Sequence, residues 1–174
     1  MTRPMAARPV IGVDPSYTAT AIAFADTWAI QPTSKTDDDV RRADIIAKAV
    51  RYEAPADALV VIEAPSHASR FNGARLGSLH GVIRHTLMLA GIEWLDVAPT
   101  QLKKYATGKG NVDKVAMVIA ARDRLGYDGQ DDNVADALWL RQIGLALTEQ
   151  PCAEVPKVHW SVLDKLRPQP EGAA

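Results

Sequence analysis

Two apolar runs that end in acidic residues constrain the fold of this chain more than any other feature. Residues 10–13 read VIGV and precede Asp14, and residues 58–62 read ALVVI and precede Glu63. Near-continuous apolar runs of this length are typical of strands that helices bury on both faces of a sheet. Open α/β sheets bind ligands beyond the carboxyl ends of their strands, and both acids fall at such ends. If the two strands are neighbours, their carboxylates lie close together.

The whole pattern predicts an α/β fold in which a mixed five-stranded sheet is flanked by α-helices. Residues 10–13, 18–25 and 27–30 are expected to form three early antiparallel strands, and strand and helix patterns alternate after them. The later strands are predicted at residues 58–62 and 92–97, and the helices at 37–52, 74–90, from Pro99, at 112–125 and at 131–147.

The chain is expected to form one domain with a tail. Residues 1–150 carry the periodic segments, whereas residues 151–174 hold four prolines and little periodicity. We therefore predict a domain over residues 1–150 and an extended C-terminal tail over residues 151–174, held in place by Trp160.

A third acidic segment, DDNVADALWL, begins the last predicted helix. Asp132 and Asp136 are four residues apart, so on a helix they lie about 40° apart on one face. Asp131 would point away and is the better candidate for the N-cap, whereas Asn133 could share the face of Asp136. Acidic residues are also common at helix starts because they interact favourably with the helix dipole, so a purely structural role stays open for this segment.

Asp14, Glu63, Asp132 and Asp136 are thus the candidate catalytic and metal-binding residues. A site of carboxylate oxygens alone suits Mg²⁺ or Mn²⁺ better than zinc. Two such ions held close together can activate a water and stabilise the transition state of phosphodiester hydrolysis.

Basic residues gather in the middle of the chain although the net charge is −1. Residues 70–124 hold nine basic and four acidic side chains, and the segments on either side are net acidic. This distribution favours a phosphate-binding face beside the carboxylates, although solvated helix surfaces would show the same charge. The candidate DNA-binding residues are Lys103, Lys104, Lys109 and Lys114 around Gly108 and Gly110, extended by Arg70, Phe71 and Arg75.

Five segments in order resemble the RuvC-type Holliday-junction resolvases, nucleases of the RNase H-like superfamily. The segments are GVDPSYTATAIA, VVIEAP, ARLGSLHGVI, QLKKYATGKGNVDKVAMV and DDNVADALWL. The resemblance implies an RNase H-like fold with Asp14, Glu63 and Asp136 as metal ligands. The family has an acid or a histidine three residues before the last aspartate, where this chain has Asn133, so Asp132 is favoured for the fourth position.

The same resemblance implies the DNA contacts and the activity. Lys103 and Lys114 match lysines that contact DNA, and Phe71 lies near an aromatic residue that stacks on junction bases. The implied activity is that of a homodimeric, structure-selective endodeoxyribonuclease. It would cleave Holliday junctions and other branched DNA with two Mg²⁺ ions per site, replaceable by Mn²⁺, and leave 5′-phosphate ends. The predicted helix over residues 74–90 is the candidate dimer surface.

Three other functions fit parts of the pattern. The chain could be an RNase H-like nuclease that acts on RNA or flaps, or a junction-binding relative without activity in which Asn133 marks a lost ligand. The segment DPSYT loosely resembles the phosphate loop of actin-like kinases, but the glycine of that loop is missing and the chain is short.

The sequence also suggests where the protein acts. Residues 1–9 lack the apolar core of a signal peptide, and no uncharged apolar run reaches about 18 residues. Cys152 is the single cysteine, so no intrachain disulfide can form. We expect a cytoplasmic protein without a membrane partner, in a bacterial or phage-infected bacterial cell.

Overall fold

The computed structural model describes residues 7–25, 27–65 and 73–167. Within them, five strands form one sheet in the order β3-β2-β1-β4-β5. β1 (Val10–Asp14), β2 (Ala19–Phe24) and β3 (Thr27–Pro32) are antiparallel neighbours, whereas β4 (Leu59–Glu63) and β5 (Glu93–Val97) extend the sheet parallel to β1. The predicted mixed sheet with three early antiparallel strands is therefore confirmed.

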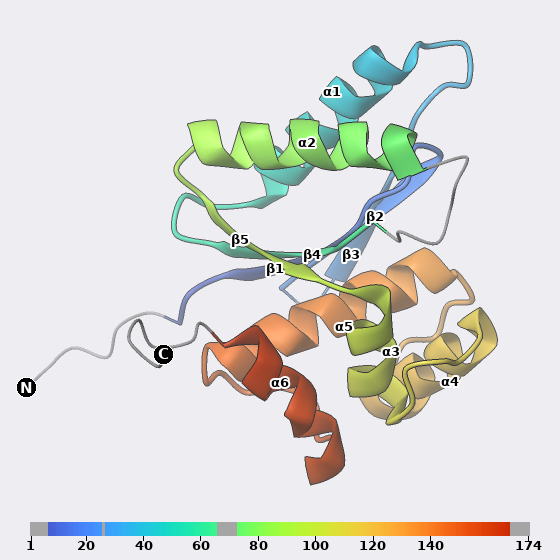
Figure 1. The fold of residues 1–174 in the computed structure, drawn as a ribbon, viewed down its shortest axis with the longest axis vertical. Coiled ribbons are helices and arrows are strands. Elements are labelled where there is room, and N and C mark those ends of the chain that lie inside the picture. Colours follow the sequence, from blue (N-terminus) through green and yellow to red (C-terminus); the bar gives the residue numbers. More distant parts are fainter. Residues whose placement is uncertain (1–6, 26, 66–72, 168–174) are drawn as a thin grey trace, which may run out of the picture.

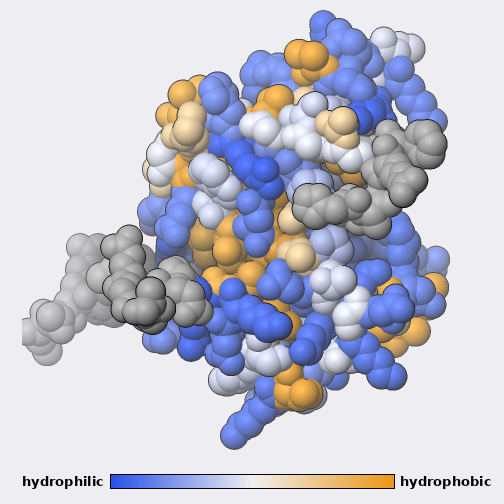
Figure 2. All heavy atoms as spheres, viewed as in Figure 1, coloured by the Kyte–Doolittle hydropathy of each residue, from blue (hydrophilic) through white to orange (hydrophobic). Residues whose placement is uncertain are grey.

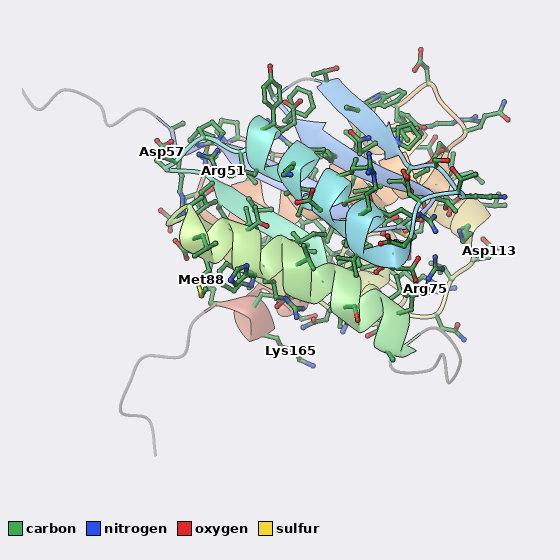
Figure 3. The ribbon with its side chains drawn as sticks, turned by 90° about the horizontal axis from the view of Figure 1, so that it is seen from above. Arg51, Asp57, Arg75, Met88, Asp113 and Lys165 are labelled. Carbon is green, nitrogen blue, oxygen red and sulfur yellow. The ribbon has the colours of Figure 1, made fainter. Side chains whose placement is uncertain are left out.

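Helices cover both faces of this sheet (Figure 1). α1 (Asp39–Glu53) and α2 (Gly73–Leu89) pack together on one face, and Figure 3 shows them lying over the strands. The other face carries α3 (Pro99–Thr107), α4 (Lys114–Leu125), α5 (Asp132–Leu147) and α6 (Ser161–Leu166). Figure 2 shows hydrophobic residues in the middle of the visible side, between two largely hydrophilic helical layers. None of the helices described here is long and apolar enough to span a bilayer.

The alternation of side chains along the strands sorts the core into two clusters. Ile11, Val13, Val60 and Ile62 pack toward α1 and α2, whereas Val10, Leu59 and Val61 pack toward α5. Because successive side chains in a strand point to opposite faces, Asp14 and Glu63 belong to the face of Val10 and Val61. The backbone alone therefore turns both acids toward the layer that holds α5.

A glycine lets α5 lie unusually close to the central strand. A Cβ atom on Gly12 would stand 2.0 Å from the Ala137 carbonyl oxygen and 2.6 Å from the Arg141 nitrogen. Farther along α5, a Cβ on Gly144 would stand 2.5 Å from Val10 Cγ1 and 2.7 Å from Val61 Cγ2. Both contacts are too short for real Cβ atoms, so the two glycines permit α5 and the sheet to approach each other.

Local capping accounts for the helix starts. The Asp131 carboxylate accepts a hydrogen bond from the Val134 nitrogen at 3.1 Å, so Asp131 is the N-cap of α5, as predicted. Asp113 caps α4 in the same way through the Ala116 nitrogen at 2.8 Å. This cap starts α4 at Lys114, two residues later than the predicted start at residue 112.

The prediction of an extended conformation is wrong for residues 157–166. They form a 3-10 helix, η1 (Lys157–Trp160), followed directly by α6. Val162 and Leu163 are buried in the core beneath α5, whereas Trp160, the predicted anchor, is 53% exposed. His159 holds the segment instead, because its buried ring pairs with the Tyr105 carbonyl oxygen of α3 at 2.8 Å. Such short helices are stabilised by tertiary burial and leave little periodic signal in a sequence.

The close approach at Gly12 leads to a stability prediction. Gly12→Ala should destabilise the protein by about 3 kcal/mol or more, because the new methyl group meets backbone atoms that cannot rotate away. Gly81→Ala is the matched control, since Gly81 is an exposed residue of α2 with nothing within 4 Å of its would-be Cβ. It should be neutral or stabilise by up to about 1 kcal/mol. Urea denaturation measures both, and equal effects would contradict the packing argument.

Candidate metal centre

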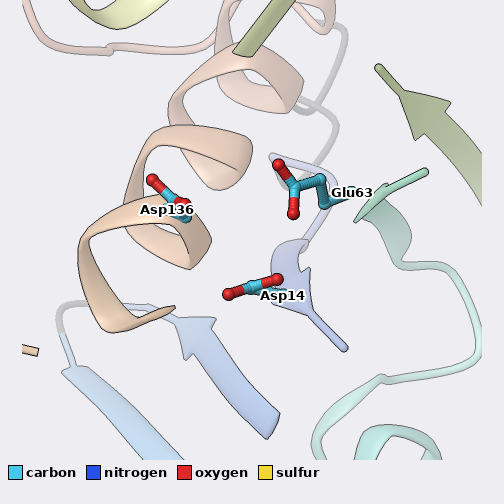
Figure 4. Close-up of side chains that lie close together, drawn as sticks. All are labelled: Asp14, Glu63 and Asp136. Carbon is cyan, nitrogen blue, oxygen red and sulfur yellow. The ribbon is translucent and has the colours of Figure 1, made fainter. Parts of the chain in front are cut away.

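Three carboxylates from distant parts of the chain meet at one edge of the sheet. Asp14 ends β1, Glu63 ends β4 and Asp136 lies in the second turn of α5. One carboxylate oxygen from each lies within 4.8 Å of the others. Figure 4 shows the three side chains converging from these elements. The structure therefore brings Asp14, Glu63 and Asp136 together, as the sequence predicted.

Strand register and helix packing explain this convergence. In the parallel pair of β1 and β4, Val13 lies opposite Ile62, so Asp14 and Glu63 are the next residues on their strands at the same edge. Gly12 lets α5 cross β1 at Ala137, which follows Asp136 in the chain. The same close contact that packs the helix thus delivers its carboxylate beside Asp14.

Burial and mutual repulsion make this cluster hold protons tightly. The pKa of Asp14 is raised well above its ordinary value, first by burial and then by the negative charges of Glu63 and Asp136. Burial, with Glu63 and Asp132, raises the pKa of Asp136 to about 7. Burial also raises the pKa of Glu63, whereas a hydrogen bond with Asp14 lowers it.

The donor set fits a hard divalent cation. Among the described residues, Oδ1 of Asp136 is buried without any hydrogen-bond partner. A buried acceptor of this kind is costly unless a ligand or an ion satisfies it. Carboxylate oxygens alone are the donors that Mg²⁺ and Mn²⁺ prefer. Asp14, Glu63 and Asp136 are therefore the residues that could hold such an ion.

The structure distinguishes the three candidates for a fourth ligand. Asp131 is occupied as the N-cap of α5, and the Asn133 amide donates to the Ala19 carbonyl oxygen of β2 at 3.2 Å. Asp132 forms an ion pair with Lys114 and lies outside the group of three, but its charge raises the pKa of Asp14 and of Asp136. Among residues 131–133, Asp132 is thus the one whose carboxylate lies near the cluster and does not serve as a helix cap.

Two of the four predicted lysines act on the cluster. Lys103 and Lys114 both lower the pKa of Glu63 and of Asp136, because their positive charges favour the ionised carboxylates. The Lys103 ammonium donates to the Val112 carbonyl oxygen at 2.8 Å. Lys104 is half-buried on α3, and Lys109 is exposed in the loop that follows α3.

Arg75, a predicted DNA contact, is bound to protein side chains in the structure. Its guanidinium donates to both carboxylate oxygens of Asp39, at 2.5 and 2.7 Å, and lies 4.4 Å from the centre of the Tyr17 ring. These contacts tie the start of α2 to the start of α1. Arg70 and Phe71 lie outside the described residues, so the structure does not place them.

Arg42, which the sequence pattern did not single out, supports the turn after Asp14. Arg42 is buried on α1 and donates to the Tyr17 carbonyl oxygen at 2.6 Å and to Thr33 Oγ1 at 2.9 Å. The signal was present, because Arg42 lies beside Ala43 and four residues before Ile46, on the edge of the apolar stripe of α1.

The raised pKa of Asp136 predicts how stability depends on pH. A carboxyl group with a raised folded-state pKa contributes stability at low pH, and this contribution is lost as pH rises from about 4 to about 7. In metal-free buffer, Asp136→Asn should therefore become more stable than the parent protein as pH rises over this interval. At pH 8 its free energy of unfolding should be higher by on the order of 2–4 kcal/mol. Urea denaturation at pH 4 and pH 8 measures the gain, and parallel pH curves would show that Asp136 does not feel the cluster.

Comparisons with known proteins agree with this architecture. The structure of RuvC from Thermus thermophilus superposes with a TM-score of 0.63 at 19% identity, over 84% of this chain and 99% of that chain. A structure of the same protein in complex with a Holliday junction substrate gives a TM-score of 0.60 at 17% identity, with the same coverage. No protein-family model and no curated protein matches the sequence. The fold resemblance predicted from the sequence is confirmed, and the chain has the RNase H-like fold of RuvC.

Proposed function

We propose that this protein is a metal-dependent, structure-selective endodeoxyribonuclease that cleaves Holliday junctions and other branched DNA. One observation carries the proposal, namely the convergence of Asp14, Glu63 and Asp136 around a buried, unsatisfied carboxylate oxygen at the sheet edge. The likeness to a RuvC that was solved with a junction substrate supports the choice of DNA as the substrate.

The acidic residues would together ligate the ions. Asp14, Glu63 and Asp136 would ligate Mg²⁺ or Mn²⁺, and Asp132 would complete the site for a second ion. When bound, the ions supply an activated water and stabilise the charge of the transition state, which leaves a 5′-phosphate end. The parallel register of β1 and β4 and the crossing of α5 at Gly12 bring the ligands together before any ion binds.

Positive charge beside the cluster would draw the phosphate backbone to it. Lys103 and Lys114 lie close enough to lower the pKa of two of the carboxylates, so a scissile phosphate near the ions would meet both ammonium groups. Lys104 and Lys109 would extend this contact along α3 and its loop, with Arg70 and Phe71 as the proposed junction contacts and Arg75 as a weaker candidate.

A homodimer would match two cuts to the twofold symmetry of a junction. α2 is the proposed interface, because its end exposes Met88 and Leu89 while Leu79, Ile83 and Leu87 fill its own core. A bacterial cytoplasm, or that of a phage-infected bacterium, is the proposed location, since the matching RuvC structures come from a bacterium.

The activity can be tested with a labelled four-way junction in Mg²⁺. The parent protein should cut it, and Asp14→Asn and Glu63→Gln should each lower the rate by more than about 100-fold, because each removes a metal ligand. Both variants should still bind the junction. Asp44→Asn is the matched control, since Asp44 pairs with Lys48 on α1, across the sheet from α5, and its variant should cut normally.

The substrate set decides between the proposal and its rivals. Flap DNA, an RNA hairpin and linear duplex run in parallel, and faster cutting of RNA or flaps would make the protein a different RNase H-like nuclease. Junction binding without any cutting in Mg²⁺ or Mn²⁺ would support a non-catalytic relative, in which the bonded Asn133 marks a lost ligand.

The DNA-binding surface can be tested through salt dependence. Lys109 is exposed and forms no ion pair with any described residue, so Lys109→Ala should flatten the slope of log affinity against log salt by about 0.9. Lys48→Ala removes an exposed charge from the face opposite α5 and should leave the slope unchanged. Equal slopes for parent and Lys109→Ala would exclude Lys109 from the DNA contact.

A further inference from the structure

Lys114 occupies a position that is unfavourable for a cation on its own helix. It is the first residue of α4, directly after the N-cap Asp113. The positive end of a helix dipole lies at this terminus and repels an ammonium group. The Lys114 side chain thus gains no stabilisation from the dipole of its own helix, and its favourable partner is a carboxylate on another element.

That negative charge comes from the acidic residues of the candidate metal centre. The Lys114 ammonium pairs with Oδ2 of Asp132, the first residue of α5. The pKa of Lys114 is raised by Asp132 first, and by Asp14 and Asp136 as well. Lys103 differs, because its ammonium is bound to the Val112 carbonyl oxygen. Of these two lysines, Lys114 is the one that contacts a carboxylate, that of Asp132 beside the cluster.

We propose that Lys114 is a built-in counter-ion that neutralises Asp132 in the metal-free protein and leaves Asp132 when divalent ions bind the cluster. This inference rests on the proposed metal-dependent function. It follows from charge and position, because the ammonium holds the carboxylate that a second ion would need. A doubly charged ion among four carboxylates attracts them more strongly than one ammonium does, and it repels that ammonium.

The displacement would couple metal loading to DNA binding. The Lys114 side chain is 74% exposed and Asp132 is 31% exposed, so the pair is held weakly and the lysine is able to reach solvent. Once released, the same charge becomes available to a phosphate beside the ions. The protein would therefore present its full positive charge to DNA only when its metal site is loaded.

A double-mutant cycle with and without metal tests the proposal. The melting temperature is measured for the parent protein, Lys114→Met, Asp132→Asn and the double variant, in EDTA and in Mg²⁺ at one neutral pH. In EDTA the pair should show a stabilising coupling of about 1–3 °C. In Mg²⁺ this coupling should vanish or change sign. The exposed Lys48–Asp44 pair of α1 is the matched control, and its coupling should be the same in both buffers.

Mg²⁺ affinity, followed by the same melting shift, provides a second measurement. Lys114→Met should bind Mg²⁺ about 5- to 10-fold more tightly than the parent protein, because it removes one unit charge at contact distance. Lys103→Met should tighten binding less, since its ammonium is not bound to a carboxylate. Equal tightening in the two variants would mean that only general electrostatics acts, which overturns the displacement.

The outcomes separate this inference from the proposed function. If Mg²⁺ stabilises the parent protein but the Lys114–Asp132 coupling persists, the displacement is wrong and the metal site stands. If Mg²⁺ stabilises none of the variants, both the displacement and the metal-dependent function are overturned.

Discussion

The close contact between α5 and β1 at Gly12 is the constraint on which the rest of the structure depends. It sets the depth of the larger core, which α5 shares with the sheet, and it carries Asp136 to the end of β1. Strand alternation directs Asp14 and Glu63 to the same face. Packing and site geometry are therefore one problem here, because any side chain at position 12 would move the helix and separate the carboxylates.

This arrangement is unfavourable without a counter-charge. Asp14 is buried, and Glu63 and Asp136 lie half-buried beside it. Neighbouring charges raise the pKa of Asp14 and of Asp136, and one oxygen of Asp136 has no partner among the described residues. Two lysines offset part of the repulsion. A protein that keeps such a cluster beneath a well-packed helix gives up stability at neutral pH, as expected for residues retained for function and not for folding.

Some basic residues around the cluster bind other parts of the protein, whereas others are exposed to solvent. Arg42 and Arg75 hold the turn after Asp14 through Tyr17 and Asp39, which explains why a basic residue near the site need not face DNA. His159 braces α3 from the C-terminal segment, close to the loop that carries Lys109. Lys109, in contrast, is exposed in that loop, and Lys114 pairs with Asp132 beside the cluster.

The sequence by itself determined the strands, most of the helices and the places of Asp14 and Glu63 at strand ends, because these depend on local rules, whereas the packing of α5 at Gly12 brought Asp136 to them. Apolar runs gave the buried strands, their last residues gave Asp14 and Glu63, and Asp131 capped α5 as its residue type predicts. Only the tertiary structure decided the pairing of Asp132 with Lys114, the burial of Arg42 and the folding of residues 157–166. Each of these depends on the charged or apolar surface that a distant segment packs against the residue. The residue's neighbours in sequence do not specify that surface.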